Sequence, residues 1–351
     1  MQPMKILSFG AGAIGTFIGG SLALAGHKVV FVEQSQAAEL LRSTGLKLNL
    51  QLDTRRQGLA EYKLVSPIVE FAGSLPEALS FGPFDAALFA LKSYDTQSAL
   101  EGMAAYQDNI PAILCLQNGV DNEPVIAAQL GIGKVISGTV TSAIGRRGVG
   151  DIVLEKNRGM GVAAGHPLSQ RLVEALEGAY LNARLFPNAA DMKWSKLLTN
   201  LLANPTSAIL DMTAAQVFEN PDLYRLEIAQ LKECLAVMKA QGINVVDLPG
   251  TPVRMLALAA SLPLWLSKPF LSKAAGAGRG AKMPSFHIDL HSGRGKSEVV
   301  YLHGAIVRAG QKYGVPTPVN RLLTETLLDM TTGKIALDEF ARKPEKLLAR
   351  L

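Results

Sequence analysis

The sequence has few cysteines and no concentrated block of positive charge. Its two cysteines, Cys115 and Cys234, each lie within an apolar stretch. They cannot build a disulfide framework or a metal cluster, so a reducing cytoplasm is the expected location. Lys and Arg together number 35 against 30 Asp and Glu. This small surplus is scattered along the chain, whereas nucleic-acid binding proteins gather theirs into basic patches. We therefore expect no nucleic-acid partner.

The sequence also has no apolar run long enough to cross a membrane. The most apolar segment, Met255–Leu266, is bounded by Arg254 and Lys268 and interrupted by Pro263. A spanning helix needs about 20 apolar residues. Near the start, Lys5 is followed almost at once by a glycine cluster, so we expect no export signal. We expect Met255–Leu266 to be a core helix or to face a second copy of the chain in a homodimer, with no membrane association.

What the sequence does contain is enough apolar material for two cores. Of its 351 residues 48% are hydrophobic and 19% charged, and this length fits two domains. The first half alternates short strand-like runs with helical segments, which predicts an α/β fold with a mostly parallel sheet. From about Asp191 only helical spacing continues. We place the domains at residues 1–188 and 189–351.

The expected strands are short apolar or β-branched runs, and the expected helices are longer segments with helical periodicity. The strands are Lys5–Phe9, Lys28–Val32, Ala86–Ala90, Ile113–Leu116, Val135–Thr141, Gly150–Leu154, Gly159–Ala163 and Ala183–Phe186. The helices are Ile14–Ala25, Asp191–Leu202, Pro205–Val217, Pro221–Gln241, Lys296–Tyr313 and Val319–Met330.

A glycine motif of the form G-x-G-x-x-G stands between the first expected strand and the first expected helix. The first glycine allows a tight turn, the second lets the backbone approach a pyrophosphate, and the third lets the helix pack closely on the sheet. The helix N-terminus then offers N–H groups to the phosphates. This order predicts a Rossmann-type, dinucleotide-binding first domain followed by an all-helical second domain. The expected cofactor-binding residues of the loop are Gly10, Ala11, Gly12, Ala13, Ile14 and Gly15.

Glu33 stands at the end of the second expected strand, 23 residues after Gly10. An acidic side chain at about this position accepts hydrogen bonds from the adenosine ribose and repels a 2′-phosphate. Glu33 thus favours NAD over NADP. The alternative is a solvated strand-end glutamate, in which case Gln34 and Ser35 leave room for a phosphate.

Lys196, Asn200 and Asn204 recur at four-residue spacing between leucines. Each four-residue step turns a helix by only ~40° beyond a full circle, so the three side chains form one polar stripe. Pro205 is expected to force Asn204 out of the helical region and to end or kink the helix. A stripe of this kind on an apolar helix is either solvated or lines a cavity.

The stripe fits the chemistry of carbonyl reduction. Hydride addition leaves negative charge on the oxygen, which an ammonium such as that of Lys196 can stabilise and then protonate. Asn200 and Asn204 can bind a carboxylate or hydroxyl without adding charge. The alternative is a surface lysine followed by two capping asparagines.

Over nearly its full length the chain resembles the ketopantoate reductases (2-dehydropantoate 2-reductases). The resemblance rests on the segments KILSFGAGAIG, ALKSYDT, LQNGVDNE, GTVTSA, KLLTNLLANP and PSFHIDLHSGRGKSE. It implies a Rossmann domain, a helical substrate and dimerisation domain, and a substrate cleft between them. It also implies NADPH-dependent reduction of the C2 ketone of 2-dehydropantoate, a 2-oxo acid, to (R)-pantoate on the route to pantothenate and coenzyme A.

The resemblance also implies roles for individual residues. Lys196 corresponds to the family's proton donor, and Glu298 to its late glutamate near the cofactor and the substrate hydroxyl. The other implied positions are the substrate-binding Asn200, Asn204, Ser285 and Asn118, the last also a cofactor-binding residue beside the nicotinamide, and the cofactor-binding cleft residue Lys92. Lys92 and Asn118 also follow expected strands, whose carboxyl ends bind ligands in parallel sheets. On the sequence alone, Asn118-Gly119 slightly favours an ordinary turn.

Several alternatives remain open at this stage. The cofactor is NADP by family resemblance or NAD by Glu33, and the substrate could be a different 2-oxo acid or ketone. A non-catalytic nucleotide sensor is a third possibility. No metal site is expected, because the only histidine pair at ligand spacing, His287 and His291, has no neighbouring carboxylate at ligand spacing in the sequence. The remaining histidines, which show no such spacing, are His27, His166 and His303.

Overall fold

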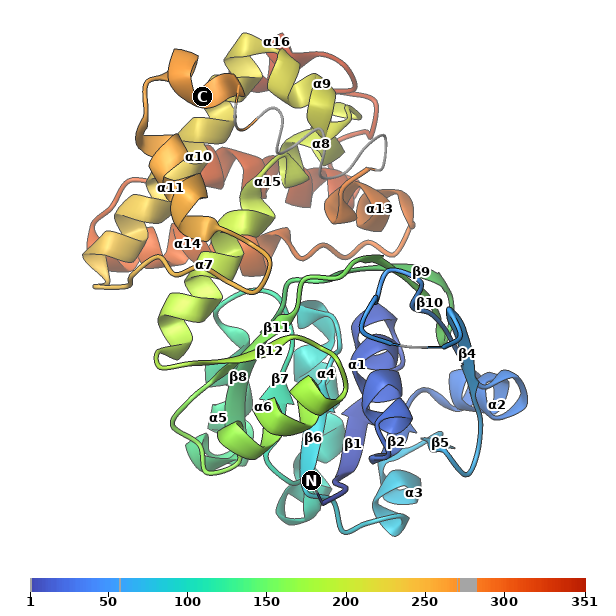
Figure 1. Ribbon diagram of the computed structural model, residues 1–351. Helices are drawn as coiled ribbons and strands as arrows, with labels where there is room; N and C mark the ends of the chain where they lie inside the picture. Colours follow the sequence, from blue (N-terminus) through green and yellow to red (C-terminus); the bar gives the residue numbers. More distant parts are fainter. Residues whose placement is uncertain (1, 57, 270, 272–282) are drawn as a thin grey trace. The chain divides into compact units, whose positions relative to one another are not determined.

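The computed structural model describes residues 2–56, 58–269, 271 and 283–351 (Figure 1). Its internal contacts divide the chain into two compact units. Unit 1 comprises Met1–Gln117, Asp121–Lys193 and Leu248–Thr251. Unit 2 comprises Asn118–Val120, Trp194–Asp247 and Pro252–Leu351.

Unit 1 is built on an eight-stranded sheet in the order β12-β11-β8-β7-β6-β1-β2-β5. Neighbouring strands of this sheet run parallel except β8 and β11, which are antiparallel. The strand order reverses between β1 and β6, and in open α/β sheets this switch point is where ligands bind. The strands are β1 (Lys5–Phe9), β2 (Lys28–Val32), β5 (Val69–Ala72), β6 (Ala86–Phe89), β7 (Ile113–Cys115), β8 (Val135–Val140), β11 (Met160–Ala163) and β12 (Ala183–Phe186).

The sheet is buried on both faces, which explains why its central strands are apolar throughout. In β1, Ile6 belongs to one hydrophobic cluster and Leu7 to another. In β6, Leu88 and Phe89 divide in the same way. Successive strand residues point to opposite faces, so each cluster is the core on one side of the sheet.

Helices that connect the strands of unit 1 cover this sheet. Figure 1 shows α1 beside the central strands, and α1 contacts both β1 and β2. The helices are α1 (Ala13–Leu24), α2 (Ser35–Thr44), α3 (Leu75–Ser80), α4 (Thr96–Met103), α5 (Asn122–Leu130) and α6 (Ser169–Gly178), with short 3-10 segments η1 (Ser93–Asp95), η2 (Ala104–Asn109) and η3 (Ile132–Lys134).

A second, four-stranded sheet in the order β4-β3-β10-β9 was not expected from the sequence. The strands β3, β4 and β9, and also β5 of the main sheet, were not predicted from the sequence. The strand β4, for example, is the polar run EYKL, and only its last residue is buried. The strands of this sheet are β3 (Leu46–Asn49), β4 (Glu61–Leu64), β9 (Ala143–Gly148) and β10 (Asp151–Lys156).

In unit 2 the described part of the chain forms helices and no strands. The predicted fold class is therefore confirmed. The boundary between the units falls inside α7 (Ala189–Leu201), after Lys193. The remaining helices are α8 (Asn204–Leu210), α9 (Ala214–Glu219), α10 (Pro221–Ala240), α11 (Val253–Ser261), α13 (Ser285–His291), α14 (Val299–Tyr313), α15 (Pro318–Thr331) and α16 (Pro344–Leu348).

The predicted helix Pro205–Val217 is wrong, because two helices, α8 and α9, occupy this stretch. Asp211 separates them in the left-handed conformation, with φ 49°. The expectation that Pro205 forces Asn204 out of the helical region is also wrong. The break comes earlier, at left-handed Ala203 (φ 52°), and Asn204 is the first residue of α8. Proline is tolerated there because the first turn of a helix needs no N–H donor.

The apolar segment Met255–Leu266 is not one helix buried in the core. The helix α11 ends at Ser261, shortly before Pro263, and Met255 and Leu258 are 61% and 54% exposed. In the part of the chain that the structure describes, every helix is too short or too polar to span a bilayer.

Candidate active site

The glycine loop connects β1 to α1 at the switch point of the main sheet. Gly10 has φ +94°, which favours glycine, and its N–H donates to Val32 O at 3.0 Å. A Cβ on Gly15 would lie 1.9 Å from Gly10 O, so only glycine lets α1 start this close to the loop. These two glycines are therefore required by the protein's own backbone.

Gly12 is different, because a Cβ there would meet no protein atom within 4 Å. The protein's own packing therefore does not require glycine at this position, whereas close approach of a pyrophosphate does. Gly12 is also the N-cap of α1, and no described side chain caps this helix end. The N–H groups of the first turn and the helix dipole thus suit an anion. The loop fits a dinucleotide.

Glu33 follows β2 and binds the glycine loop. Its Oε1 accepts a hydrogen bond from Ala11 N at 2.5 Å, and its Oε2 lies 3.4 Å from Gln34 N. The carboxylate is thereby fixed beside the loop that would hold the pyrophosphate. Its negative charge disfavours binding of an anionic group, such as a 2′-phosphate, next to the carboxylate.

Lys92 and Asn118 follow two strands of the main sheet. Lys92 lies three residues beyond the end of β6 and precedes η1, and Asn118 lies three residues beyond the end of β7. Gly119 has φ +95°, so the chain turns sharply after Asn118. By its contacts Asn118 belongs to unit 2, whereas Lys92 belongs to unit 1.

In unit 2, Lys196, Asn200 and Asn118 are joined by hydrogen bonds. Lys196 Nζ donates to Asn200 Oδ1 at 3.0 Å, and Asn200 Nδ2 donates to Asn118 Oδ1 at 3.3 Å. The first bond follows from the four-residue spacing on α7, whereas the second joins residues 82 apart in sequence. An ammonium held by an amide can stabilise a developing alkoxide and donate a proton to it.

A second set of contacts brings Ser285 to the same helix break. Asn204 Nδ2 donates to Asn200 O at 3.2 Å, and Asn204 Oδ1 accepts from Ser285 Oγ at 3.4 Å and from Phe286 N at 3.2 Å. Asn204 thus links the end of α7 to the start of α13. The amides and the hydroxyl provide uncharged hydrogen-bonding groups of the kind that bind a carboxylate or a hydroxyl.

Glu298 is the N-cap of α14 and is 4% exposed. Its backbone carbonyl accepts hydrogen bonds from Tyr301 N and Leu302 N. Glu298 thus starts this helix from a buried position in unit 2.

Glu227, which was not predicted from the sequence as a site residue, stabilises the break between α7 and α8. Glu227 is fully buried, and its carboxylate accepts from Ala203 N at 2.7 Å and from Thr206 Oγ1 at 2.5 Å. The bond to Ala203 stabilises the left-handed residue next to Asn204. The sequence did contain a clue to its burial. Glu227 is four residues from both Leu223 and Leu231, so helical spacing places it on the buried face of α10.

Lys193 was missed as well, although it lies only three residues before Lys196. It is buried in unit 1, with Nζ 2.7 Å from Glu123 Oε1 and 2.8 Å from Gln117 O. Burial is the largest single influence and lowers the pKa of Lys193, but the charges of Glu123 and Cys115 and the hydrogen bond to Glu123 together outweigh it, so the net shift is upward. Its four-residue spacing to Leu197, an apolar residue that is buried, could have predicted that Lys193 is buried too.

A glycine loop on a mostly parallel sheet followed by a helical region is the architecture of an NAD(P)-dependent oxidoreductase that acts on a ketone or alcohol group, and the family matches assign this chain to that class. The chain belongs to the ketopantoate reductase family. Two family models match it: "Ketopantoate reductase PanE/ApbA" over residues 6–165, and "Ketopantoate reductase PanE/ApbA C terminal" over residues 188–331.

Individual relatives agree with this assignment. The chain is 26% identical over 339 residues to a protein of Archaeoglobus fulgidus named 2-dehydropantoate 2-reductase, covering 95% of this chain and 98% of that one. It is similar to a crystal structure of a PanE/ApbA family ketopantoate reductase from Ralstonia eutropha JMP134. The TM-score is 0.77 at 25% identity, with 94% of this chain and 99% of that chain covered. The fold is also that of a D-mandelate dehydrogenase solved with NADH and anilino(oxo)acetate, with TM-score 0.72, 22% identity, and coverage of 94% and 99%.

Proposed function

We propose that this chain reduces the ketone of 2-dehydropantoate to (R)-pantoate, with Lys196 as the proton donor and NADPH or NADH as the cofactor. The hydrogen-bonded set Lys196–Asn200–Asn118 supports this proposal most directly. Residues 1–188 would bind the dinucleotide and residues 189–351 the substrate. A bound dihydronicotinamide supplies the hydride.

Lys196 would act at the substrate oxygen. Hydride addition to the ketone carbon turns the carbonyl into an alkoxide, and a positioned ammonium stabilises this charge more than it stabilises the ketone. Proton transfer from Nζ then completes the alcohol. The bond from Nζ to Asn200 Oδ1 restricts the lysine side chain, and Asn118 in turn holds the Asn200 amide. Asn200 would thus be a positioning residue for Lys196 as well as a substrate ligand.

Asn204 and Ser285 would bind the carboxylate of the 2-oxo acid. The Ser285 hydroxyl donates to Asn204 Oδ1 in this structure and can rotate to donate to a carboxylate oxygen instead. Asn204 remains in place because Phe286 N and Asn200 O also hold its amide. Glu298, Lys92 and Asn118 are proposed to contact the cofactor, and Glu298 also the substrate hydroxyl, on the strength of the family resemblance.

Replacement of the lysine tests the proton-donor role. We expect Lys196→Ala to lower kcat for 2-dehydropantoate by about 10²–10⁴-fold, the usual range for losing a general acid. The dissociation constant for NADPH, measured by fluorescence titration, should stay the same. The matched control is Lys232→Ala, which removes an exposed lysine from α10. Turnover near that of the unmodified protein in Lys196→Ala would overturn the assignment.

The substrate is tested by a panel of 2-oxo acids that differ in the group attached to the ketone. Oxidation of NADPH or NADH is followed by the loss of reduced-nicotinamide absorbance. The highest kcat/KM with 2-dehydropantoate supports the proposal. A higher value with an aryl 2-oxo acid, the class suggested by the D-mandelate dehydrogenase relative, would assign a different reductase activity. Binding of NADPH without turnover of any ketone would favour a nucleotide sensor.

We further propose that the enzyme is a cytoplasmic homodimer. The exposed Met255 and Leu258 on α11 support an interface between copies, since exposed apolar patches often mark protein contacts. Light scattering coupled to gel filtration measures the mass directly, and Met255→Lys combined with Leu258→Lys should shift a dimer toward the monomer. A monomer mass for the unmodified protein would contradict this part of the proposal.

A further inference from the structure

We propose that Asp211, His287 and His291 form a binding site for a divalent transition-metal ion of the zinc class. The three residues lie in unit 2, and their potential ligand atoms all lie within 4.8 Å of one another. None of the three residues is assigned to the cofactor or the substrate, although His287 lies on the same helix as Ser285, so the inference goes beyond the reductase activity.

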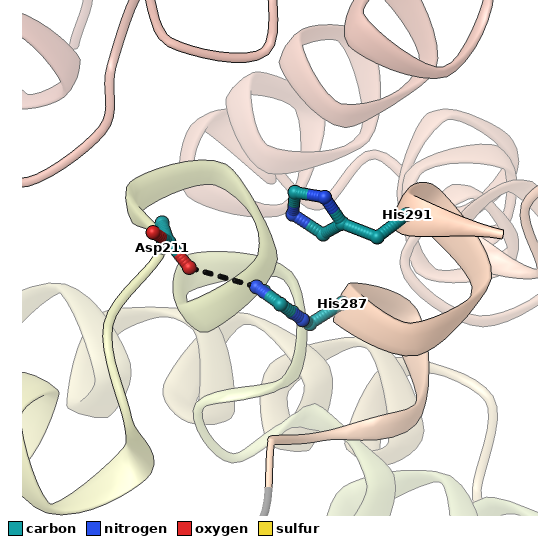
Figure 2. A group of neighbouring side chains, drawn as sticks. All are labelled: Asp211, His287 and His291. Atoms are coloured by element: carbon teal, nitrogen blue, oxygen red, sulfur yellow. Dashed lines mark hydrogen bonds and ion pairs between the residues drawn. The ribbon is translucent and has the colours of Figure 1, made fainter. Parts of the chain in front are cut away.

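Helix α13 supplies the two imidazoles. His287 and His291 are four residues apart, so they lie one turn apart on the same face of the helix. Their ring centroids are 4.2 Å apart with an interplanar angle of 37°. Figure 2 shows both rings on the side of α13 that faces Asp211. A pair of histidines at this spacing is a frequent half of a zinc site.

Asp211 supplies the carboxylate from a different part of the chain. His287 Nε2 lies 2.8 Å from Asp211 Oδ1, although the two residues are 76 positions apart in sequence. Asp211 follows α8 in the left-handed conformation, and its backbone N–H donates to Ser207 O. In the sequence the histidine pair has no carboxylate at ligand spacing. In the structure α13 packs against α8, which brings the Asp211 carboxylate next to the pair.

The donor set selects the class of ion. Two imidazole nitrogens and one carboxylate oxygen suit zinc and its neighbours, whereas magnesium and calcium prefer oxygen ligands alone. Tetrahedral ligands about 2.0–2.1 Å from zinc lie about 3.3 Å from one another. The hydrogen bond of 2.8 Å from His287 to Asp211 would open slightly and His291 would move closer. Rotation about side-chain bonds suffices, because Asp211 and His291 are exposed.

The ion would join the two helices at a second place. Near the start of both helices, Asn204 of α8 accepts from Ser285 and Phe286 of α13. The metal would connect Asp211, just beyond the last residue of α8, to His291, the last residue of α13. An ion that binds only the folded chain stabilises it in proportion to the logarithm of its concentration. Zinc should therefore raise the unfolding temperature.

The test is calorimetric titration of untagged, metal-free protein with zinc chloride in slightly alkaline buffer, without cofactor or substrate. We expect saturable binding of one ion per chain. His291→Ala and Asp211→Asn should each weaken zinc binding by about ten-fold or more. The matched control is His166→Ala, which removes a half-buried histidine from unit 1 and should leave the affinity unchanged.

Two further readouts separate a built site from unspecific binding. Cobalt as a zinc substitute should give visible absorption bands of tetrahedral coordination, and these should be lost in His291→Ala. Zinc should raise the unfolding temperature of the unmodified protein and of His166→Ala, with a smaller effect on the two site variants. Absence of saturable zinc binding, or equal affinity in both site variants and the control, would overturn the proposal. Either result leaves the reductase assignment untouched.

Discussion

Lys193 Nζ lies 2.7 Å from Glu123 Oε1, and both side chains are almost fully buried, with exposed fractions of 6% and 11%. The ammonium also donates to Gln117 O, the carbonyl immediately before Asn118. The ion pair therefore fixes the chain at the end of β7, where one of the proposed site residues begins. A buried charge whose partner is removed is strongly destabilising.

We predict that Glu123→Gln lowers the free energy of unfolding by about 3–5 kcal/mol, because it leaves the Lys193 ammonium buried without its counter-charge. Urea unfolding followed by circular dichroism measures the change. Glu101→Gln, which removes an exposed carboxylate from α4, should cost about 0.5 kcal/mol or less. The double change Glu123→Leu with Lys193→Met should recover much of the loss. Equal stability of Glu123→Gln and Glu101→Gln would refute the role of the pair.

The pH dependence of this pair has a definite sign. The pKa of Lys193 is raised in the folded state. Its contribution is therefore fully present below the ordinary lysine pKa of about 10.4 and is lost as the pH rises through the raised value. Across the neutral range the difference in unfolding free energy between the unmodified protein and Glu123→Gln should stay constant.

His303 gives a prediction for the acid range. It is fully buried in unit 2, with Nε2 3.0 Å from Gln230 Oε1, and burial lowers its pKa to about 3. Below the ordinary histidine pKa of about 6.5 the unfolded chain takes up a proton that the folded chain does not. Stability is thus complete above that pH and falls below it, by about 1.4 kcal/mol per pH unit at most.

The replacement His303→Gln keeps a donor for Gln230 but cannot titrate in this range. We expect it to reduce the loss of unfolding free energy between about pH 7 and about pH 5 relative to the unmodified protein, whereas His166→Gln, a control at a half-buried histidine of unit 1, should not. Urea titrations at both pH values give the two losses. An unchanged loss in His303→Gln would show that other groups carry the acid sensitivity.

The elements that could be predicted from the sequence are those set by short-range pattern. The glycine loop, β1 and β2 follow from residues within one βαβ unit, and the stripe of Lys196 and Asn200 follows from helical spacing alone. The second sheet could not be predicted in the same way. Its β4 is short and polar and gains its place only by pairing with β3, so local propensity gives no signal.

The same distinction applies to the candidate site. Ser285 meets Asn204 across 81 residues, and Asp211 meets His287 across 76. Sequence periodicity cannot predict these contacts, because they form only when α13 packs against α8. The buried Glu227 accepts a hydrogen bond from the N–H of left-handed Ala203, and the helix break lies there, ahead of Pro205. Long-range packing thus placed the residues that sequence spacing could not.

Ser285 should affect substrate binding more than the chemical step. We predict that Ser285→Ala raises KM for the 2-oxo acid by about ten-fold, the loss of one hydrogen bond to a charged group, with a smaller change in kcat. The dissociation constant for NADPH should not change. Ser292→Ala, which removes an exposed hydroxyl just after α13, is the matched control. A fall in kcat at constant KM would instead give Ser285 a role in the transition state.

Glu33 should decide the preference between the two cofactors. Its Oε1 accepts from Ala11 N, so Glu33→Gln can keep this acceptor and remove only the charge, whereas Glu33→Arg removes both. Without the charge, repulsion of the 2′-phosphate ends and the hydrogen bond to the ribose hydroxyls of NADH weakens. We expect the ratio of kcat/KM with NADPH to that with NADH to rise about ten-fold or more in Glu33→Gln, from steady-state rates with each cofactor. Glu39→Gln removes the same charge from an exposed position on α2 and should leave the ratio unchanged. If both variants keep the original ratio, Glu33 only fastens the glycine loop, and the preference must come from other residues around the ribose.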